Sequence, residues 1–233
     1  MANQTAVVVG VGPGLGWAVT KKLVQNGYQV FAAARKKESL DALVGAEKGL
    51  ADRVVTVSCD ATNAASVKEL FAKAKDVDVA VFNAGAFGMK PFLELDDETM
   101  QSMWRVNCLA GFHVGQEAAR AMVPRGKGTI IFTGATAALR GGSGFAAFAS
   151  SKFALRAVAQ SMARELGPKN IHVAHVVIDG IIAAGRSAAY VQGKGEDAGL
   201  SADAIAETYL HIVNQHRSAW THEIDLRPFA ERF

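Results

Sequence analysis

Closely spaced glycines mark the first segment of this sequence that could do chemistry, Gly-Val-Gly-Pro-Gly-Leu-Gly at residues 10–16. An apolar run precedes it and an amphipathic run follows it, so the segment is predicted to connect a buried strand to a helix. A glycine turn at that place lets the backbone approach a pyrophosphate, and the helix N-terminus supplies N–H donors. The spacing fits G-x-x-x-G-x-G through Gly10, Gly14 and Gly16, because Leu15 takes the last glycine position of G-x-G-x-x-G. A turn with only a structural role is the alternative.

A second signal lies at the end of the next apolar run. An acidic residue roughly 20 positions beyond such a loop would bind the ribose hydroxyls of NAD. Here the chain has Arg35, Lys36 and Lys37 instead, and the first carboxylate is Glu38. Because a cationic fork can hold a 2′-phosphate, Arg35 and Lys36 are predicted to bind NADP(H) in preference to NAD(H). A solvated run of charges at a helix start is the alternative.

Short apolar runs alternate with longer amphipathic runs and must position these residues. Strands are predicted at residues 6–10, 29–34, 54–58, 78–83, 128–133, 171–177 and 219–226, and helices at 15–26, 38–48, 64–75, 97–122, 148–166 and 201–215. Continuous Val/Ile/Ala runs separated by helices are typical of parallel strands covered on both faces. The predicted fold class is α/β, a doubly wound parallel sheet (Rossmann fold) of about seven strands with helices on both faces. Since no linker or repeat interrupts the pattern, residues 1–233 are predicted to form one domain.

Composition and spacing argue against several other classes. The net charge is +3 and the basic residues are scattered, so no nucleic-acid partner is predicted. Cys59 and Cys108 lie in apolar contexts, which favours reduced core thiols. His172 and His175 would face opposite sides of a strand, so no metal site is predicted. The start of the chain lacks positive charge and no apolar run reaches membrane-spanning length, which predicts a cytoplasmic protein with no membrane partner.

Several motifs together make the chain resemble the short-chain dehydrogenase/reductase family over nearly its whole length. The glycine loop matches the family's G-x-x-x-G-x-G, residues 83–85 match its Asn-Ala-Gly segment, and Ser151-Lys152 ends its Tyr-x-x-x-Lys signature. Asn107 falls where the family has its helix-borne active-site asparagine. The loop and the resemblance together imply cofactor contacts at Gly10, Gly14, Leu15, Gly16, Arg35, Lys36, Asp60, Ala61, Asn83, Ala84, Gly85, Lys152 and Gly180.

The two catalytic hydroxyls of the family pattern are missing. Phe148 stands at the tyrosine position and Ala135 at the serine position, and the longer spacing between tyrosine and lysine would place Phe145 there instead. The chain thus resembles a small subgroup of the family that keeps the lysine and has phenylalanine for tyrosine. Asp179-Gly180 also replaces the usual Pro-Gly, which predicts an atypical substrate lid.

The lost hydroxyls change the expected chemistry, because neither phenylalanine nor alanine has a donor. In the family the tyrosine protonates the carbonyl oxygen and the serine holds it, and losing a positioned general acid costs about 10²–10⁴ in rate. Ordinary ketone reduction by that route is therefore not expected. Asn107 and Lys152 remain as catalytic candidates, and Lys152 shares a helix face with Phe148, so it is expected to point at the cofactor ribose.

Two ways around the missing donors stay open. Thr133, Thr136, Ser143 and Tyr190 are candidate replacement donors. An iminium substrate would need none, because it carries its positive charge before hydride arrives.

Two functions follow from this pattern. The first is an NADP(H)-dependent oxidoreductase acting on a small molecule, and the second is a non-catalytic NADP(H)-binding sensor or assembly protein. Residues 100–122 and 148–166 resemble the helices of the family's dimer interface, so the resemblance implies a homodimer or homotetramer. The sequence does not predict which substrate is bound.

Overall fold

The computed structural model describes residues 4–47, 49–195 and 197–230. Its strands form one sheet in the order β3-β2-β1-β4-β5-β6-β7, and every neighbouring pair is parallel. The strands are β1 Gln4–Val9, β2 Tyr28–Ala34, β3 Val54–Ser58, β4 Val77–Phe82, β5 Gly128–Thr133, β6 Ile171–Ile178 and β7 Glu223–Leu226. The α-helices are α1 Leu15–Gln25, α2 Lys37–Ala46, α3 Ala64–Ala74, α4 Asp97–Trp104, α5 Ala110–Met122, α6 Ala146–Leu166 and α7 Ala202–Val213. The predicted fold class is confirmed.

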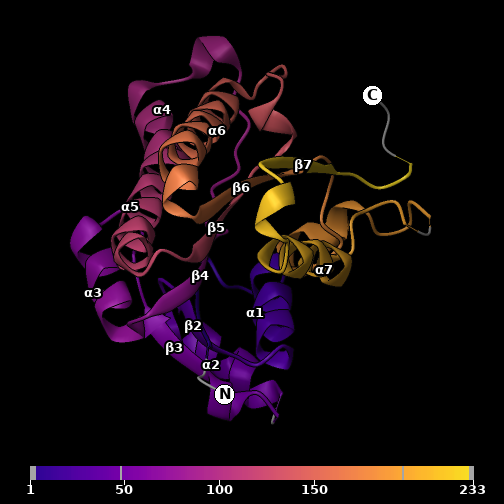
Figure 1. Cartoon of the computed structure of the whole chain (residues 1–233). Coiled ribbons are helices and arrows are strands. Elements are labelled where there is room, and N and C mark those ends of the chain that lie inside the picture. The colour runs from indigo at the N-terminus through magenta and orange to yellow at the C-terminus, as the bar shows by residue number, and fades with distance from the viewer. Residues whose placement is uncertain (1–3, 48, 196, 231–233) are drawn as a thin grey trace.

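Helices cover both faces of the sheet (Figure 1). Helices α3, α5 and α6 pack on one face, and α1, α2 and α7 pack on the other. The alternation of side chains along β1 explains why both faces are apolar: Ala6 and Val8 belong to one core cluster, and Val7 and Val9 to the other. These four side chains are almost completely buried, as the continuous apolar run predicted.

Several element boundaries differ from those predicted. The helix predicted at residues 97–122 is divided by a π-helical stretch, Arg105–Leu109, which adds an extra residue to one turn. Helix α6 begins at Ala146, and β7 begins only at Glu223 because Arg217–Ala219 form a 3₁₀ turn. Helix α2 ends at Ala46, and the predicted end of that helix lies outside the described residues.

The strand order reverses at β1, which pairs with β2 on one side and β4 on the other. The loops that follow β1 and β4 leave the same edge of the sheet and turn to opposite faces, which opens a crevice between them. At this edge the Asn83 N–H donates to the carbonyl of Val9 at 2.8 Å, and the Gly10 N–H donates to the carbonyl of Ala33 at 2.9 Å. The ends of three strands are thus held together where the crevice begins.

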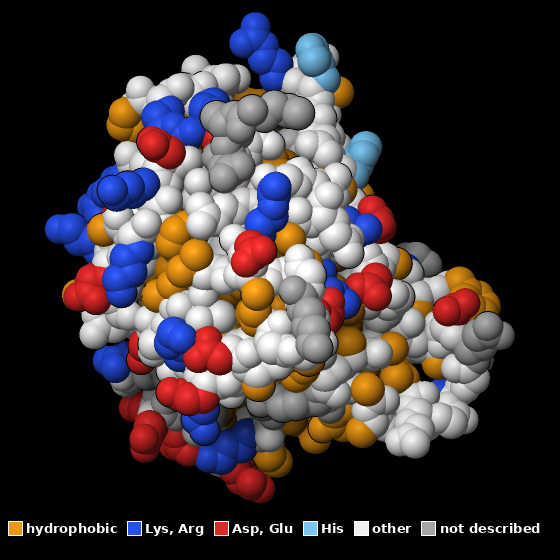
Figure 2. Space-filling model, turned by 90° about the horizontal axis from the view of Figure 1, so that it is seen from below, with side chains coloured by type: hydrophobic (Ala, Val, Ile, Leu, Met, Phe, Trp, Pro, Cys, Tyr) orange, Lys and Arg blue, Asp and Glu red, His pale blue; other side chains and the backbone are white. Residues whose placement is uncertain are grey.

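One face of the surface carries acidic and basic side chains interspersed with apolar ones (Figure 2). A surface of mixed sign does not produce the single-sign field that attracts polyanions. In the described part of the chain, every helix is too short or too polar to cross a membrane.

Candidate functional site

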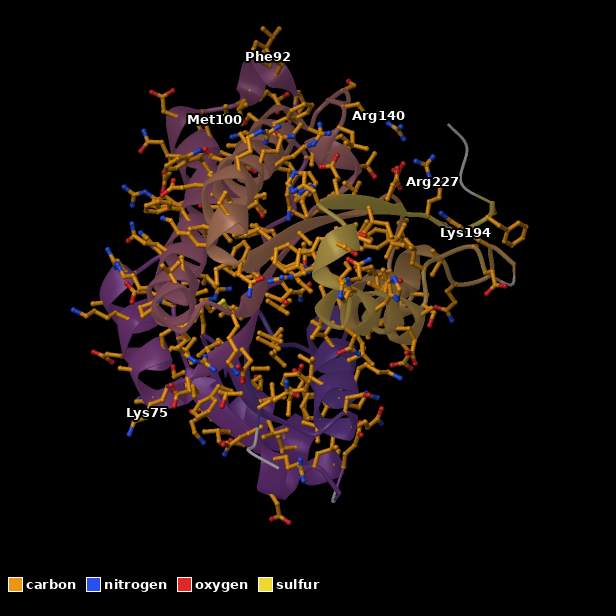
Figure 3. The ribbon with its side chains drawn as sticks, viewed as in Figure 1. Lys75, Phe92, Met100, Arg140, Lys194 and Arg227 are labelled. Carbon is orange, nitrogen blue, oxygen red and sulfur yellow. The ribbon has the colours of Figure 1, made fainter. Side chains whose placement is uncertain are left out.

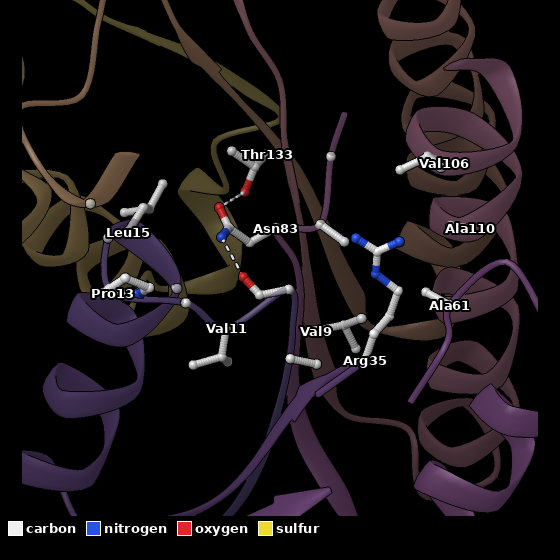
Figure 4. A pocket seen from close by; sticks show the side chains of 18 of the residues that line it. Val9, Val11, Pro13, Leu15, Arg35, Ala61, Asn83, Val106, Ala110 and Thr133 are labelled. Carbon is white, nitrogen blue, oxygen red and sulfur yellow. Dashed lines mark hydrogen bonds between the residues drawn. The ribbon is translucent and has the colours of Figure 1, made fainter. Parts of the chain in front are cut away.

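A pocket of about 570 Å³ lies at the carboxyl ends of β1, β2, β3 and β4 (Figure 4). Its lining includes ten of the predicted cofactor contacts: Gly10, Gly14, Leu15, Gly16, Arg35, Asp60, Ala61, Asn83, Ala84 and Gly85. Lys36, Lys152, Asn107 and Gly180 are not among the lining residues. The other lining residues are Val9, Val11, Gly12, Pro13, Ala34, Cys59, Thr62, Val106, Ala110, Thr133, Ile182, Ala184, Gly185 and Ser187. Of these, Gly12 and Pro13 belong to the glycine segment and Thr133 is one of the candidate replacement donors.

Two glycines of the loop allow the backbone to fold this closely. Gly10 has φ +91°, and a Cβ there would lie 2.2 Å from the backbone nitrogen of Ala84. A Cβ on Gly16 would lie 2.6 Å from the carbonyl oxygen of Gly10. A side chain at either position is sterically forbidden, because real Cβ atoms do not approach backbone atoms so closely. Because Gly10 and Gly16 pack this closely, the backbone of residues 10–16 lines the pocket.

The N-terminus of α1 points its free donors at the pocket. Gly14 is the N-cap residue, no side chain of the described residues caps this end, and the first turn has no acidic residue. The first N–H groups of a helix have no partner within the helix and carry a partial positive charge. An anion is the chemical group that satisfies such an uncapped terminus.

Arg35 brings a full positive charge to the same pocket. Figure 4 shows its guanidinium extending from the end of β2 across the pocket, and among the described residues no carboxylate pairs with it. The neighbouring cations differ, since Lys37 forms an ion pair with Asp41 at 2.8 Å and Lys36 is exposed outside the pocket. Of the predicted basic pair, only Arg35 lines the pocket.

The loop after β3 forms another wall. Asp60 accepts hydrogen bonds from the N–H and the hydroxyl of Thr62 at 3.0 and 2.8 Å through one carboxylate oxygen. The carbonyl of Ala61 accepts a hydrogen bond from His113 Nδ1 at 3.0 Å, which ties this loop to α5. Asp60 and Ala61 are thus fixed at positions where the resemblance implies a cofactor contact.

Asn83 connects the glycine loop to β5 (Figure 4). Its Nδ2 donates to the carbonyl of Gly10 at 3.0 Å, and its Oδ1 accepts from Thr133 Oγ1 at 3.2 Å. The hydroxyls of Thr133 and Tyr209 are 2.8 Å apart, and Tyr209 is fully buried. Burial raises the pKa of Tyr209 well above its ordinary value, so this phenol keeps its proton.

Asn107 sits in the π-helical stretch and is completely buried. Its Oδ1 accepts from the N–H of Ala86 at 3.0 Å, and its Nδ2 donates to the carbonyl of Ala86 at 3.0 Å and to Ser151 Oγ at 3.1 Å. Both amide hydrogens are therefore used within the protein. Asn107 fixes the segment after β4 against α6, a role that sequence reasoning did not predict.

Lys152 is buried beside the pocket rather than solvated, with 6% of its surface exposed. Its Nζ donates to the carbonyl of Thr133 at 3.0 Å, and a Cβ built on Gly85 would lie 3.7 Å from Nζ. Thr133 and Gly85 both line the pocket, so the ammonium group lies directly behind its wall. Burial lowers the pKa of Lys152 to about 8, because the charged form loses its hydration.

The hydroxyls near the lost serine are committed to other partners. Ala135 is extended and precedes a short 3₁₀ turn. Thr136 Oγ1 donates to Asp179 Oδ1 at 2.5 Å, and Thr133 Oγ1 donates to Asn83. Ser143 and Tyr190 are exposed. Among the four candidate replacement donors, Thr133 and Thr136 donate their hydroxyl protons to protein atoms in the described structure. Ser143 and Tyr190 do not line the pocket.

Asp179 ties together the segments that bound the site. Its carboxylate is 1% exposed and lies 3.5 Å from Arg140 and 3.3 Å from Arg227 in addition to its bond with Thr136. Figure 3 shows the two arginines at the same end of the molecule. Asp179, which follows β6, therefore joins the loop after β5 to the segment after β7. It stands at the position where the family pattern has proline. The next residue, Gly180, has φ +151° and packs against Pro228.

Phe148 belongs to an aromatic cluster with Phe87 and Phe145. Its ring centroid lies 5.3 Å from that of Phe87 with the rings edge to face, and the Phe87 and Phe145 centroids are 5.7 Å apart. The sequence motifs did not indicate this cluster, because Phe87 comes from the segment after β4, whereas Phe145 and Phe148 lie at the start of α6. No group of residues able to hold a metal ion occurs in the described parts of the chain, where His172 and His175 are instead bonded to Thr221 and Glu223.

Comparison with known proteins agrees with this geometry. A family model for short chain dehydrogenase matches residues 4–192. L-xylulose reductase of Bos taurus is 33% identical over 174 residues, which cover 74% of this chain and 70% of that protein. The crystal structure of a short-chain dehydrogenase from Rhodopseudomonas palustris is 43% identical, with a TM-score of 0.86 over 98% of this chain and 100% of that one.

A third similar protein was solved with a nucleotide. An alcohol dehydrogenase from the archaeon Thermococcus sibiricus, complexed with 5-hydroxy-NADP, is 25% identical with a TM-score of 0.85 over 98% of both chains. The family model and the two relatives above 30% identity each cover most of this chain, and the model and the Rhodopseudomonas palustris structure both carry the description short-chain dehydrogenase. The chain therefore belongs to the short chain dehydrogenase family.

Proposed function

We propose that this protein is an NADP(H)-dependent oxidoreductase with a non-standard active site, which acts on a small molecule whose reduction needs no tyrosine proton donor. The observation that carries the proposal is the pocket in which the uncapped N-terminus of α1 and the Arg35 guanidinium face the same space. Both features favour phosphate groups, and Arg35 stands where an NAD-specific protein would have a carboxylate. The volume of the pocket also lies within the range of small-molecule sites.

Each predicted site residue has a role in this proposal. Gly10, Gly14, Leu15 and Gly16 hold the pyrophosphate through backbone N–H groups and close approach, and Arg35 holds the 2′-phosphate, with Lys36 adding positive charge at the rim. Asp60 and Ala61 would hold the adenine, and Asn83, Ala84, Gly85, Lys152 and Gly180 would hold the nicotinamide half. A bound NADPH supplies hydride. Relatives whose names identify them as a reductase and an alcohol dehydrogenase support this class of reaction.

The remaining catalytic residues are Asn107 and Lys152, with Ala135 and Phe148 at the positions of the lost hydroxyls. The phenylalanine at the tyrosine position supports the proposal that the chain belongs to the subgroup that has phenylalanine for tyrosine. Lys152 holds a proton at Nζ with a pKa of about 8, so its ammonium form predominates at neutral pH. An iminium substrate enters already protonated and avoids the need for the missing donor.

A non-catalytic NADP(H)-binding protein, a sensor or an assembly partner, is the second candidate. The full engagement of Asn107, Thr133 and Thr136 favours it, because hydroxyl or amide donors held within the protein cannot stabilise charge on a substrate. Cofactor binding alone would need only the pocket.

NADPH consumption separates the two candidates. The wild-type protein is assayed with carbonyls, enones and cyclic imines, beside an Ala135→Ser, Phe148→Tyr double variant, with NADPH binding measured for both. Robust turnover of one substrate class by the wild type, with no gain in the variant, supports an enzyme with its own proton chemistry. Turnover by the variant alone supports the non-catalytic candidate.

We also propose the domain organisation, location, partners and assembly that the sequence pattern and the resemblance imply. Residues 1–233 form one domain of a cytoplasmic protein with neither a nucleic-acid partner nor a membrane partner. The chain assembles as a homodimer or homotetramer through the outer faces of α4, α5 and α6, where Met100, Trp104, Phe112 and Phe153 expose large apolar side chains. Light scattering on the purified protein tests this assembly.

A further inference from the structure

The aromatic cluster of Phe87, Phe145 and Phe148 forms a wall next to the proposed cofactor site. Phe148 lies one helical turn before Lys152 on α6. Phe87 follows two residues after Gly85, which lines the pocket. The wall therefore begins where the pocket ends, on the side of the buried ammonium group.

This wall is apolar and yet open to solvent. Phe87 is 69% exposed although it touches both other rings, and Met89 beside it is exposed to the same extent. Large apolar side chains that gather on an exposed surface mark a place where another molecule binds. By contrast, Phe92, further along the same segment, projects from the end of the molecule (Figure 3) and makes no ring contact among the described residues.

The wall is also held in place. The Lys90 N–H donates to the carbonyl of Gly144 at 2.8 Å, which joins the segment after β4 to the segment before α6. A Cβ built on Gly144 would lie 2.8 Å from Met89 Cγ, so Met89 packs directly on that glycine. Because both segments are joined, the rings form a prearranged surface, and a ligand would not have to order them.

The polar groups at and beside the family's catalytic positions are occupied or missing. Ala135 and Phe148 have no donor, and the Asn107 amide and the Thr136 hydroxyl bond to protein atoms. A polyol would lose the water on its hydroxyls at such a surface without gaining partners, which is strongly unfavourable. A flat ring without hydroxyls has far fewer polar groups to desolvate and can stack edge to face or offset against the phenylalanines.

We propose that the aromatic cluster binds a flat, apolar ring system, so that the substrate of this protein is a cyclic imine, which enters protonated and needs only hydride, and not a sugar. The proposal rests on the proposed oxidoreductase function, and it separates this chain in substrate class from relatives such as L-xylulose reductase. Phe148 then has a positive role: it replaces a hydroxyl with apolar contact area at the ring.

Binding is measured by titration calorimetry on the full chain saturated with NADP⁺, in which no reduction of the ligand occurs. The probes are 2-tetralone and 3,4-dihydroisoquinoline, which share a fused flat ring, and L-xylulose as the polyol. The variant is Phe87→Ala, whose side chain is too exposed to be needed for folding, and the matched control is Phe229→Ala, 83% exposed outside the cluster. NADP⁺ binding is measured for every variant.

The expected result is binding of both ring probes with at least tenfold higher affinity than L-xylulose. Phe87→Ala weakens the ring probes by about tenfold, in line with the loss of one aromatic contact, and Phe229→Ala leaves them unchanged. Stronger binding of L-xylulose, or equal loss in both variants, overturns the proposal while NADP⁺ still binds. If NADP⁺ itself does not bind, the proposed function fails instead, and the ring probes titrated without it still show whether the cluster recognises them.

Discussion

The Lys152 ammonium donates a hydrogen bond to the carbonyl oxygen of Thr133 at 3.0 Å, in an interior that leaves it almost no contact with water. A charge held in this way is costly. Its pKa is about 8 in the folded protein, against an ordinary value of 10.5. The difference corresponds to about 3 kcal/mol of lost folding free energy at neutral pH.

Lys152→Met is therefore expected to raise the free energy of unfolding by about 1–3 kcal/mol at pH 7, after the lost hydrogen bond is taken into account. In the wild type the unfolded state binds more protons between pH 8 and 10.5, so stability rises with pH across that window. The variant should lack this rise. Urea unfolding at pH 7 and at about pH 9.5 measures both effects, and a variant less stable than the wild type at pH 7 would contradict the prediction.

Gly10→Ala is expected to destabilise the protein by several kcal/mol and to abolish nucleotide binding. A Cβ at this position collides with the backbone of Ala84, and φ +91° is unfavourable for any side chain. Gly12→Ala is the matched control, because a Cβ there meets no atom within 4 Å. Thermal unfolding and NADPH titration of the two variants check this, and an equal loss in both would show that the loop is fragile for another reason.

Arg35→Asp is expected to weaken NADPH binding by about 10- to 100-fold, the value of one or two charge-assisted hydrogen bonds, and to improve NADH binding. The new carboxylate would repel the 2′-phosphate and accept the ribose hydroxyls. Lys36→Asp changes the net charge equally at a residue outside the pocket and should have a much smaller effect. Fluorescence titration with both nucleotides distinguishes the two variants; similar losses would mean that only net charge matters.

His175 makes stability depend on pH on the acid side. Burial lowers the pKa of His175 below the ordinary value of 6.5. The hydrogen bond between His175 Nδ1 and Glu223 Oε2, at 2.9 Å, acts in the opposite direction but is the smaller effect. As the pH falls below about 6.5 the unfolded chain takes up this proton first, so the folded state loses stability. His172 has a pKa lowered by burial in the same way.

His175→Leu should therefore make the fall in melting temperature between about pH 7 and pH 5 shallower without removing it, since His172 still contributes. Differential scanning calorimetry across this range provides the measurement. An unchanged slope would show that His175 does not titrate on unfolding.

Much of the cofactor pocket was predictable because it depends on strand ends. Parallel strands bring their carboxyl ends to one edge, so Gly10, Arg35, Asp60 and Asn83 could be expected to meet once the apolar runs were identified as strands. Each of these residues follows directly after the end of a strand or within two residues of it, so the parallel sheet brings them together.

Other parts of the site depend on contacts that no periodicity reveals. The π-helical stretch around Asn107 has the same composition as an ordinary helix, and its bonds to Ala86 depend on the path of a loop. The contact of Phe87 with Phe148 likewise joins the loop after β4 to the first turn of α6. Charge alone predicts the same role for Lys36 and Arg35. Only the direction of the chain after β2 decides that Arg35 lines the pocket and Lys36 does not.

The position of β1 in the sheet also sets the order of events during synthesis. Contact between Gly10 and Asn83, at the ends of β1 and β4, spans 73 residues. At a ribosomal rate of about 5–20 residues per second, roughly 4–15 s pass between the emergence of the two strands. During that time β1 has β2 as a partner on one edge and nothing on the other, with its valines exposed. The first part of this chain is therefore synthesised as an unfinished sheet, and until β4 follows, the unpaired edge of β1 can pair with a strand of another chain.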